Sequence, residues 1–142
     1  MKIAIGCDHA AFQEKNELIN NLNNKDIIVK DFGCYTKDSV DYPDYAHAVC
    51  KEVQNNNFDF GILICGSGIG ISIAANRNKQ IRAALCTSEF HAKMSRKHNN
   101  ANVIALGARA TSVEEMIKMT NIFLNTDFEG GRHQKRIEKI EL

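Results

Sequence analysis

The sequence lacks the features of a membrane protein or a secreted protein. No apolar run approaches the roughly 20 residues that a transmembrane helix needs. The N-terminal residues Met1–Asp8 reach a turn and an acidic side chain after a few apolar residues, so they lack the apolar core of a signal peptide. We therefore expect a cytoplasmic protein with no membrane partner.

The sequence also lacks paired cysteines and an excess of either charge. Its five cysteines form no Cys-x-x-Cys pair, which together with the odd count predicts reduced thiols. Lys and Arg number 18 against 17 Asp and Glu, and a net charge of +1 gives no overall attraction for nucleic acid. Without repeats or low-complexity tracts, 142 residues at 44% hydrophobic content predict one domain over residues 1–142.

The most informative stretch is a glycine-rich segment in the middle of the chain. The apolar run Gly61–Ile64 ends at Cys65, and the glycine-rich residues Gly66–Gly70 lead into a helix-forming segment. This pattern predicts a buried strand that turns into a helix through a loop whose backbone N–H groups can face an anion. A thiol beside a helix N-terminus can have its pKa lowered from about 8.5 toward neutrality. The segment therefore predicts a base or nucleophile that faces a site for negative charge.

Strand-like and helix-like segments alternate along the chain. Strands are predicted at residues 2–6, 27–32, 58–64, 81–85 and 103–106. Helices are predicted from 12 to 23, from Pro43 to 54, after the glycine loop, from a cap at Thr87 or Ser88 to His98, from a capping box at Ser112 to 124, and from Arg132 to about Ile140. This order predicts an α/β fold, a Rossmann-like three-layer α/β/α sandwich around a five-stranded parallel sheet buried on both faces.

Several chemistry-bearing residues follow predicted strands directly. Asp8 and His9 follow the first strand, Cys65 the third and Arg109 the fifth. Ligands of such folds bind at the carboxyl ends of the strands, so we expect these residues to meet at one edge of the sheet.

The sequence does not match the familiar motifs for phosphate, nucleotide or metal binding. A P-loop needs a Lys that the segment from Gly66 to Ser72 lacks. Ile71 stands where a dinucleotide fingerprint needs Gly and where a cysteine-dependent phosphatase needs Arg. His91 and His98 lie two helical turns apart, too far to share a metal ion, and no HExxH motif is present. We therefore expect no metal.

Each candidate also has an ordinary structural explanation. A cysteine is more often a small packed hydrophobe than a catalyst, and only the glycine loop reverses this expectation for Cys65. The other cysteines are expected to be structural: Cys7, Cys34, Cys50 and Cys86. His9 could equally be a turn residue. Arg132 and Arg136 share one helical face, which suits either a solvated surface or a phosphate clamp.

Short motifs spread along the chain occur in the same order in one known family: Gly6–His9, Asp41–Pro43, Ile64–Ser72, Ala74–Arg77, Arg96–Asn99, Asn102–Val103, Gly107–Arg109 and Glu129–His133. By these motifs the sequence resembles the type B ribose-5-phosphate isomerase family, which also contains the galactose-6-phosphate isomerase subunits. The resemblance implies interconversion of ribose 5-phosphate and ribulose 5-phosphate in the pentose phosphate pathway, without a metal or an organic cofactor.

The resemblance also implies roles for matching residues. Cys65 would move the proton between C2 and C1, and His98 would open the sugar ring as an acid. The enediolate oxygen would be stabilised by the amides of Gly66, Ser67, Gly68, Ile69 and Gly70. Sugar hydroxyls would be held by Asp8, His9, Tyr42 and Asn99, and the phosphate by Arg109, Arg132 and Arg136 with help from His9. Many relatives have Thr in place of Ser67, and one branch replaces the Cys with a Glu at the position of Ile71.

Geometry adds an expectation about assembly. His98 closes a helix that leads into the fifth strand, so it should lie near the amino ends of the strands, away from Cys65 of the same chain. We therefore predict a symmetric homodimer, possible also as part of a tetramer, whose sites combine Cys65 of one protomer with His98 of the other. Two alternatives stay open: an isomerase of allose 6-phosphate or galactose 6-phosphate, and a non-catalytic phosphate- or nucleotide-binding module.

Overall fold

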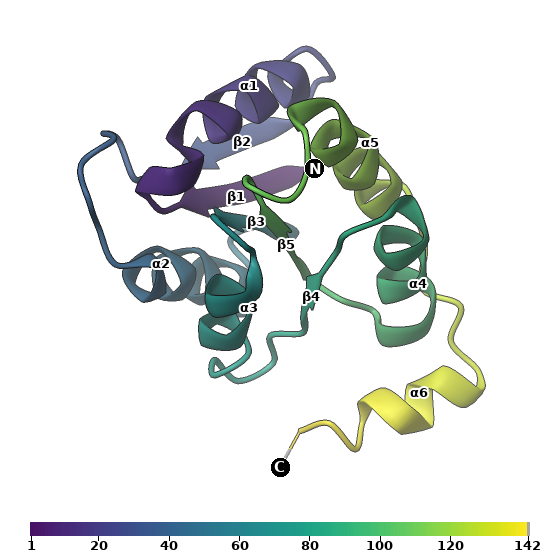
Figure 1. The fold of residues 1–142 in the computed structure, drawn as a ribbon. Helices are drawn as coiled ribbons and strands as arrows, with labels where there is room; N and C mark the ends of the chain where they lie inside the picture. The colour runs from purple at the N-terminus through teal and green to yellow at the C-terminus, as the bar shows by residue number, and fades with distance from the viewer. Residues whose placement is uncertain (142) are drawn as a thin grey trace.

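The computed structural model describes residues 1–141 and confirms the alternation of strands and helices. The strands are β1 (Lys2–Cys7), β2 (Ile28–Asp31), β3 (Phe60–Cys65), β4 (Ala83–Leu85) and β5 (Val103–Gly107). The helices are a short 3₁₀ turn η1 (His9–Ala11), then α1 (Phe12–Asn23), α2 (Tyr42–Gln54), α3 (Ile69–Ala75), α4 (Glu89–Asn99), α5 (Val113–Leu124) and α6 (Arg132–Ile137) (Figure 1). No helix within residues 1–141 combines the length and the apolar composition of a membrane span.

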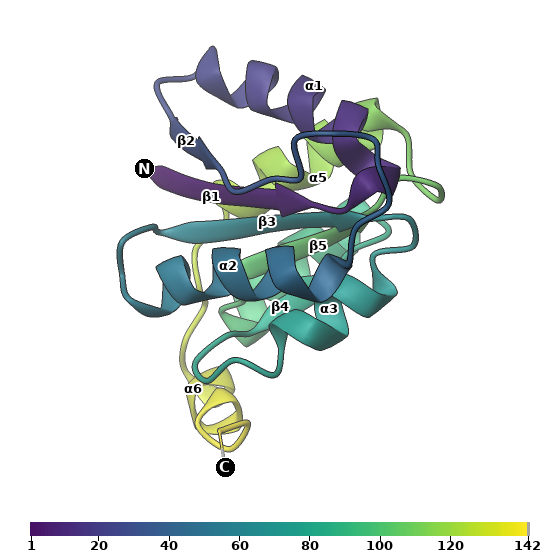
Figure 2. The same cartoon turned by 90° about the vertical axis from the view of Figure 1, so that its left-hand side faces the viewer.

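The five strands form one parallel sheet in the order β2-β1-β3-β5-β4. Helices α2 and α3 cover one face, and α1, α4 and α5 cover the other (Figures 1 and 2). The predicted three-layer α/β/α sandwich is therefore confirmed. The strand order reverses between β1 and β3, and the carboxyl ends of these two strands are where ligands bind in open α/β sheets.

The core follows the alternation of side chains along the central strands. Ile62 and Ile64 of β3 pack toward α1 and α5, whereas Leu63 and Cys65 pack toward α2 and α3. The prediction that every strand is buried on both faces is wrong for the edges. Residues of β2 and β4 are only partly buried or exposed, because an edge strand has a neighbour on one side only.

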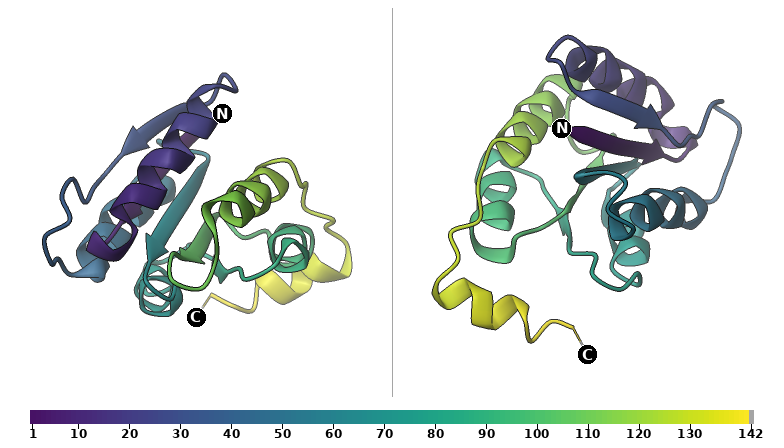
Figure 3. Two further views of the ribbon diagram at one scale, coloured as in Figure 1. Left: turned by 45° about the horizontal axis from the view of Figure 1, so that its top comes forward. Right: turned by 180° about the vertical axis from the view of Figure 1, so that it is seen from behind.

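The predicted helix boundaries hold with small differences. Ser112 and Glu115 form the predicted capping box, and the Ser88 hydroxyl accepts from the His91 amide as the cap of α4. The last helix ends at Ile137 and not near Ile140. Ile137 is buried and Ile140 is exposed, so tertiary packing supports the helix only as far as Ile137. Helix α6 stands outside the sandwich beside α4 (Figure 3).

Candidate active site

Cys65 is the last residue of β3 and borders a cavity at the carboxyl edge of the sheet. Its side chain is almost buried, with 4% exposed, and its Sγ accepts a hydrogen bond from the Gly68 amide at 3.1 Å. The cavity has a volume of about 360 Å³ and is lined by Asp8, Tyr42, Cys65, Gly66, Ser67, Gly70, Arg109 and Ala110. The thiol is therefore not sealed in the core.

The glycine loop lies directly on the end of β5. Gly68 has a φ of +77°, and a Cβ on Gly107 would stand 2.5 Å from the carbonyl oxygen of Ser67. The amides of Ala108 and Arg109 donate to the carbonyls of Cys65 and Gly66 at 2.8 and 2.9 Å. These bonds place the Arg109 side chain beside Gly66, in the same cavity as the thiol.

Two of the five amides expected to face a ligand have partners within the protein. The Gly68 amide donates to Cys65 Sγ, and the Ile69 amide donates to Ser67 Oγ at 3.2 Å. An N–H directed at the sulfur makes a contact that a thiolate accepts more strongly than a thiol does. The amides of Gly66, Ser67 and Gly70 remain as candidates for binding an oxyanion.

The predicted hydroxyl-binding residues after β1 and at the start of α2 lie around the same edge. Asp8 is buried at the cavity wall, and its Oδ1 also accepts from the Ala10 amide at 3.0 Å. His9 Nδ1 accepts from the Val40 amide at 3.1 Å, so Nε2 carries the proton of the neutral ring. The Tyr42 ring lies against Gly70, where an added Cβ would come within 2.6 Å of it.

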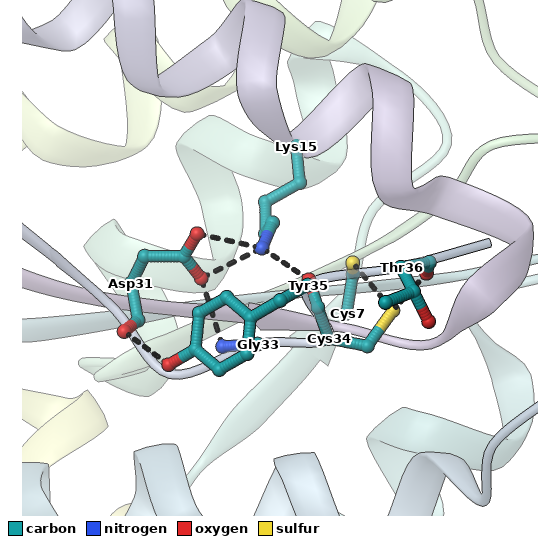
Figure 4. Close-up of polar contacts among 7 residues, drawn as sticks. All are labelled: Cys7, Lys15, Asp31, Gly33, Cys34, Tyr35 and Thr36. Carbon is teal, nitrogen blue, oxygen red and sulfur yellow. Dashed lines mark hydrogen bonds and ion pairs between the residues drawn. The ribbon is translucent and has the colours of Figure 1, made fainter. Parts of the chain in front are cut away.

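A partly buried ion pair that the sequence did not predict fixes the loop after β2 (Figure 4). Lys15 is fully buried, and its Nζ lies 2.7 Å from the Asp31 carboxylate and 2.6 Å from the carbonyl oxygen of Cys34. Asp31 also accepts from the Gly33 amide at 2.8 Å, and the Cys34 amide donates to the Cys7 carbonyl. The loop after β2 is thereby held against the residue that precedes Asp8. A charged residue in the apolar stripe of α1 was the available signal.

The other cysteines are sealed in the core, as their predicted structural role requires. Burial raises the pKa of Cys50 to about 12 and that of Cys86 to about 11. Burial, followed by the charge of Cys34, also raises the pKa of Cys7. All five cysteines are free thiols. None of these three borders the cavity beside Cys65.

The remaining predicted site residues gather elsewhere, at the junction of α4 and α6. The His98 ring, in the last turn of α4, stacks on the His133 ring with centroids 4.2 Å apart. Asn99 follows directly, and its carbonyl accepts from Arg82 Nε at 3.0 Å. Arg132 and Arg136 are exposed on α6 and line a separate cavity of about 520 Å³ with Gly131, Lys135 and Lys139.

One chain thus carries its predicted site residues in two groups. The first is the carboxyl-edge group around Cys65: Asp8, His9, Tyr42, Cys65, Gly66, Ser67, Gly68, Ile69, Gly70 and Arg109. The second is the α4–α6 group: His98, Asn99, Arg132 and Arg136. None of the α4–α6 group lines the cavity at Cys65.

Two further residues of the α4–α6 junction had no predicted role. His133 is buried, and its Nε2 lies 3.9 Å from Oε1 of Glu129, which stands four residues earlier in the linker before α6. Burial, followed by the charge of His98, lowers the pKa of His133. One donor atom from each of His98, Glu129 and His133 lies within 4.8 Å of the other two, so these side chains could hold a metal ion.

Comparisons with known proteins match almost the whole chain. The family model described as Ribose/Galactose Isomerase matches residues 3–140. The chain is 44% identical over 139 residues to ribose-5-phosphate isomerase B of Escherichia coli, covering 98% of this chain and 93% of that protein.

Solved structures show the same likeness. A ribose 5-phosphate isomerase from Thermotoga maritima is 51% identical, with a TM-score of 0.97 and coverage of 99% of this chain and 97% of that one. Ribose-5-phosphate isomerase B from Mycoplasma genitalium, solved with bound ribulose-5-phosphate, is 44% identical, with a TM-score of 0.94 and coverage of 98% and 93%. The chain therefore belongs to the ribose/galactose isomerase family, the family of the type B ribose-5-phosphate isomerases.

Proposed function

We propose that this chain interconverts ribose 5-phosphate and ribulose 5-phosphate as a single domain over residues 1–142. The observation that carries the proposal is the cavity at the carboxyl edge, where a thiol, a glycine loop and an arginine meet. The relative from Mycoplasma genitalium that shares this fold holds ribulose-5-phosphate. A cavity of about 360 Å³ is within the size range of small-ligand sites.

In the proposed reaction the Cys65 thiolate acts as a general base. It takes the proton from C2 of the open-chain aldose, the electrons of that bond form the C1–C2 double bond, and the carbonyl oxygen at C1 gains the negative charge. Return of the proton to C1 and transfer of the hydroxyl proton from O2 to O1 give the ketose. We assign the stabilisation of the charged oxygen to the amides of Gly66, Ser67 and Gly70, which have no hydrogen-bond partner within residues 1–141.

The remaining residues bind and open the sugar. We assign the hydroxyls to Asp8, His9, Tyr42 and Asn99 and the phosphate to Arg109, Arg132 and Arg136. Guanidinium groups suit this task because their planar donors match phosphate oxygens in pairs. We assign ring opening to His98, whose imidazole would protonate the ring oxygen as a general acid.

This assignment requires two protomers. His98, Arg132 and Arg136 stand outside the cavity that contains Cys65 in one chain. A symmetric homodimer resolves the separation, because the α4–α6 group of one protomer can complete the carboxyl-edge group of the other.

The function is tested by turnover of three substrates side by side in the presence of EDTA. We expect ribose 5-phosphate to be converted fastest, ahead of allose 6-phosphate and galactose 6-phosphate. Cys65→Ala should abolish turnover while sugar-phosphate binding persists. Faster conversion of a six-carbon substrate would reassign the sugar, and binding without turnover by the parental protein would identify a phosphate-binding module.

The shared site is tested by mixing two inactive variants. A verified heterodimer of a Cys65→Ala chain and a His98→Ala chain should contain one intact site, with both defects in the other. We expect such heterodimers to regain activity that neither homodimer has. Heterodimers without activity would contradict the dimer proposal.

A further inference from the structure

Three side chains with metal-binding donor atoms meet where α6 joins α4. His98 comes from the last turn of α4, and Glu129 and His133 come from the linker and first turn of α6. One donor atom of each lies within 4.8 Å of the other two. The set combines two imidazole nitrogens with one carboxylate oxygen.

The deepest of these donors has no partner. His133 is 4% exposed, and its Nε2 is a buried nitrogen without a hydrogen bond. The nearest acidic oxygen, on Glu129, is 3.9 Å away, which is too long for a hydrogen bond. Buried polar atoms are costly to leave unpaired, so this nitrogen is a position where a ligand would be stabilising.

The backbone already holds the three residues together. The Glu129 amide donates to the carbonyl of Lys97 at 3.1 Å, which ties the linker to the residue before His98. The His133 amide donates to Gly130 at 3.0 Å. Only side chains therefore need to move for the donor atoms to close around an ion.

One movement is required. The two imidazole planes are 13° from parallel, and the lone pair of an imidazole lies in its ring plane, so stacked rings cannot both point at one ion. His98 is only partly buried at the end of its helix, whereas His133 is enclosed. The His98 ring is therefore the one that turns.

We propose that His98, Glu129 and His133 form a binding site for Zn²⁺. Two histidines and a carboxylate are a Zn²⁺ ligand set, and three protein ligands leave a fourth position for water. A bound ion would occupy His98 and keep it from protonating the sugar ring, so Zn²⁺ would inhibit the enzyme. This inhibition rests on the proposed function, whereas the binding does not.

Binding is measured first, without reference to activity. Zn²⁺ is titrated calorimetrically into the EDTA-treated, dialysed full-length protein with Cys65→Ala, which removes the thiol beside the cavity as a competing ligand. We expect one Zn²⁺ per protomer. His133→Gln and, separately, Glu129→Gln should weaken binding at least about tenfold. His91→Gln, on α4 two turns before His98, is the matched control and should leave binding unchanged.

Co²⁺ reports the geometry of the same site. In the Cys65→Ala protein, Co²⁺ should give the visible absorption of a four-coordinate N/O site, and His133→Gln should remove it. Absence of stoichiometric Zn²⁺ binding, or binding unchanged in both His133→Gln and Glu129→Gln, would overturn the proposal. Glu129→Gln keeps the test decisive if His133→Gln fails to fold, because Glu129 is exposed.

Inhibition is measured second, on the protein with Cys65 intact. We expect Zn²⁺ to inhibit the parental enzyme and His91→Gln equally and to inhibit Glu129→Gln at least about tenfold less strongly. Zn²⁺ bound at the site without inhibition would remove the inhibitory role and keep the site. A protein that binds Zn²⁺ but has no isomerase activity would refute the proposed function alone.

Discussion

The two groups of site residues are held in place by different means. At the carboxyl edge, backbone hydrogen bonds from Ala108 and Arg109 to the Cys65–Gly66 segment position the base and the loop. At the α4–α6 junction, one backbone hydrogen bond from the Glu129 amide to the Lys97 carbonyl and the ring stack of His98 on His133 join the two helices, and the arginines of α6 are exposed. The comparison teaches that a sheet edge fixes the proposed base within one chain, whereas the residues beside α6 lie outside that cavity, which is why we propose that they act in a neighbouring protomer.

The largest expected effect is a loss of kcat on substitution of Cys65, compared with substitution of Cys50, a thiol buried in the core. Cys65→Ala should lower kcat by about 10²–10⁴-fold, the usual contribution of a positioned base, with little change in thermal midpoint. Cys50→Ala is the matched control: it should keep kcat and lose about 1 kcal/mol of unfolding free energy, because it leaves a small void in the core. Steady-state kinetics and thermal unfolding of both variants check this pair, and similar kcat losses in both would erase the distinction.

A smaller effect is expected when a methyl group is added to one glycine beside each group of site residues, Gly107 at the carboxyl edge and Gly130 before α6. Gly107→Ala would place a Cβ 2.5 Å from the Ser67 carbonyl oxygen, so it should displace the glycine loop. We expect a loss of about 1–3 kcal/mol in unfolding free energy together with reduced kcat. A Cβ at Gly130 would have no atom within 4 Å, but the residue has a φ of +69°. Gly130→Ala should therefore lower the unfolding free energy by only about 1–2 kcal/mol through backbone strain, and kcat should be retained.

The next prediction concerns the arginines on α6. Arg132→Met should raise KM for ribose 5-phosphate about 10- to 100-fold, the cost of one lost charge-assisted hydrogen bond, while kcat changes little. Lys139→Met, in the same surface cavity but without an assigned contact, provides the control. If Arg132→Met leaves KM unchanged, Arg132 does not bind the phosphate.

The last prediction uses pH to distinguish the thiols that are buried in the core. Burial raises the pKa of Cys50 to about 12 and that of Cys86 to about 11 from an ordinary 9.0, so the folded state keeps these thiols neutral where the unfolded state ionises them. Stability is therefore retained below pH 9 and lost as pH rises toward 11–12, at up to about 1.4 kcal/mol per pH unit for each thiol.

Urea unfolding between pH 8 and pH 10.5 measures this loss. Cys50→Ala should make the decline shallower by the contribution of one thiol. An equally steep decline in Cys50→Ala would show that ionisation of Cys50 is not responsible.

Much of the carboxyl edge could be predicted because strand ends carry local signals. The positions of Asp8, Cys65 and Arg109 follow from apolar runs that end in turns, and parallel strands bring such ends to one edge. The sequence did not predict that the amides of Gly68 and Ile69 donate to the side chains of Cys65 and Ser67. It also missed Lys15, because its partner Asp31 belongs to another element.

The sequence by itself determined the order of strands and helices, the glycine loop after β3 and the chemistry at the ends of β1, β3 and β5, because periodicity and turn residues act over a few neighbouring positions. Only the tertiary structure decided the strand order β2-β1-β3-β5-β4, the partners of the Gly68 and Ile69 amides, and the stacking of His98 on His133. The strand order and the ring stack join residues far apart in the chain, and they depend on how complete layers pack and not on any local pattern.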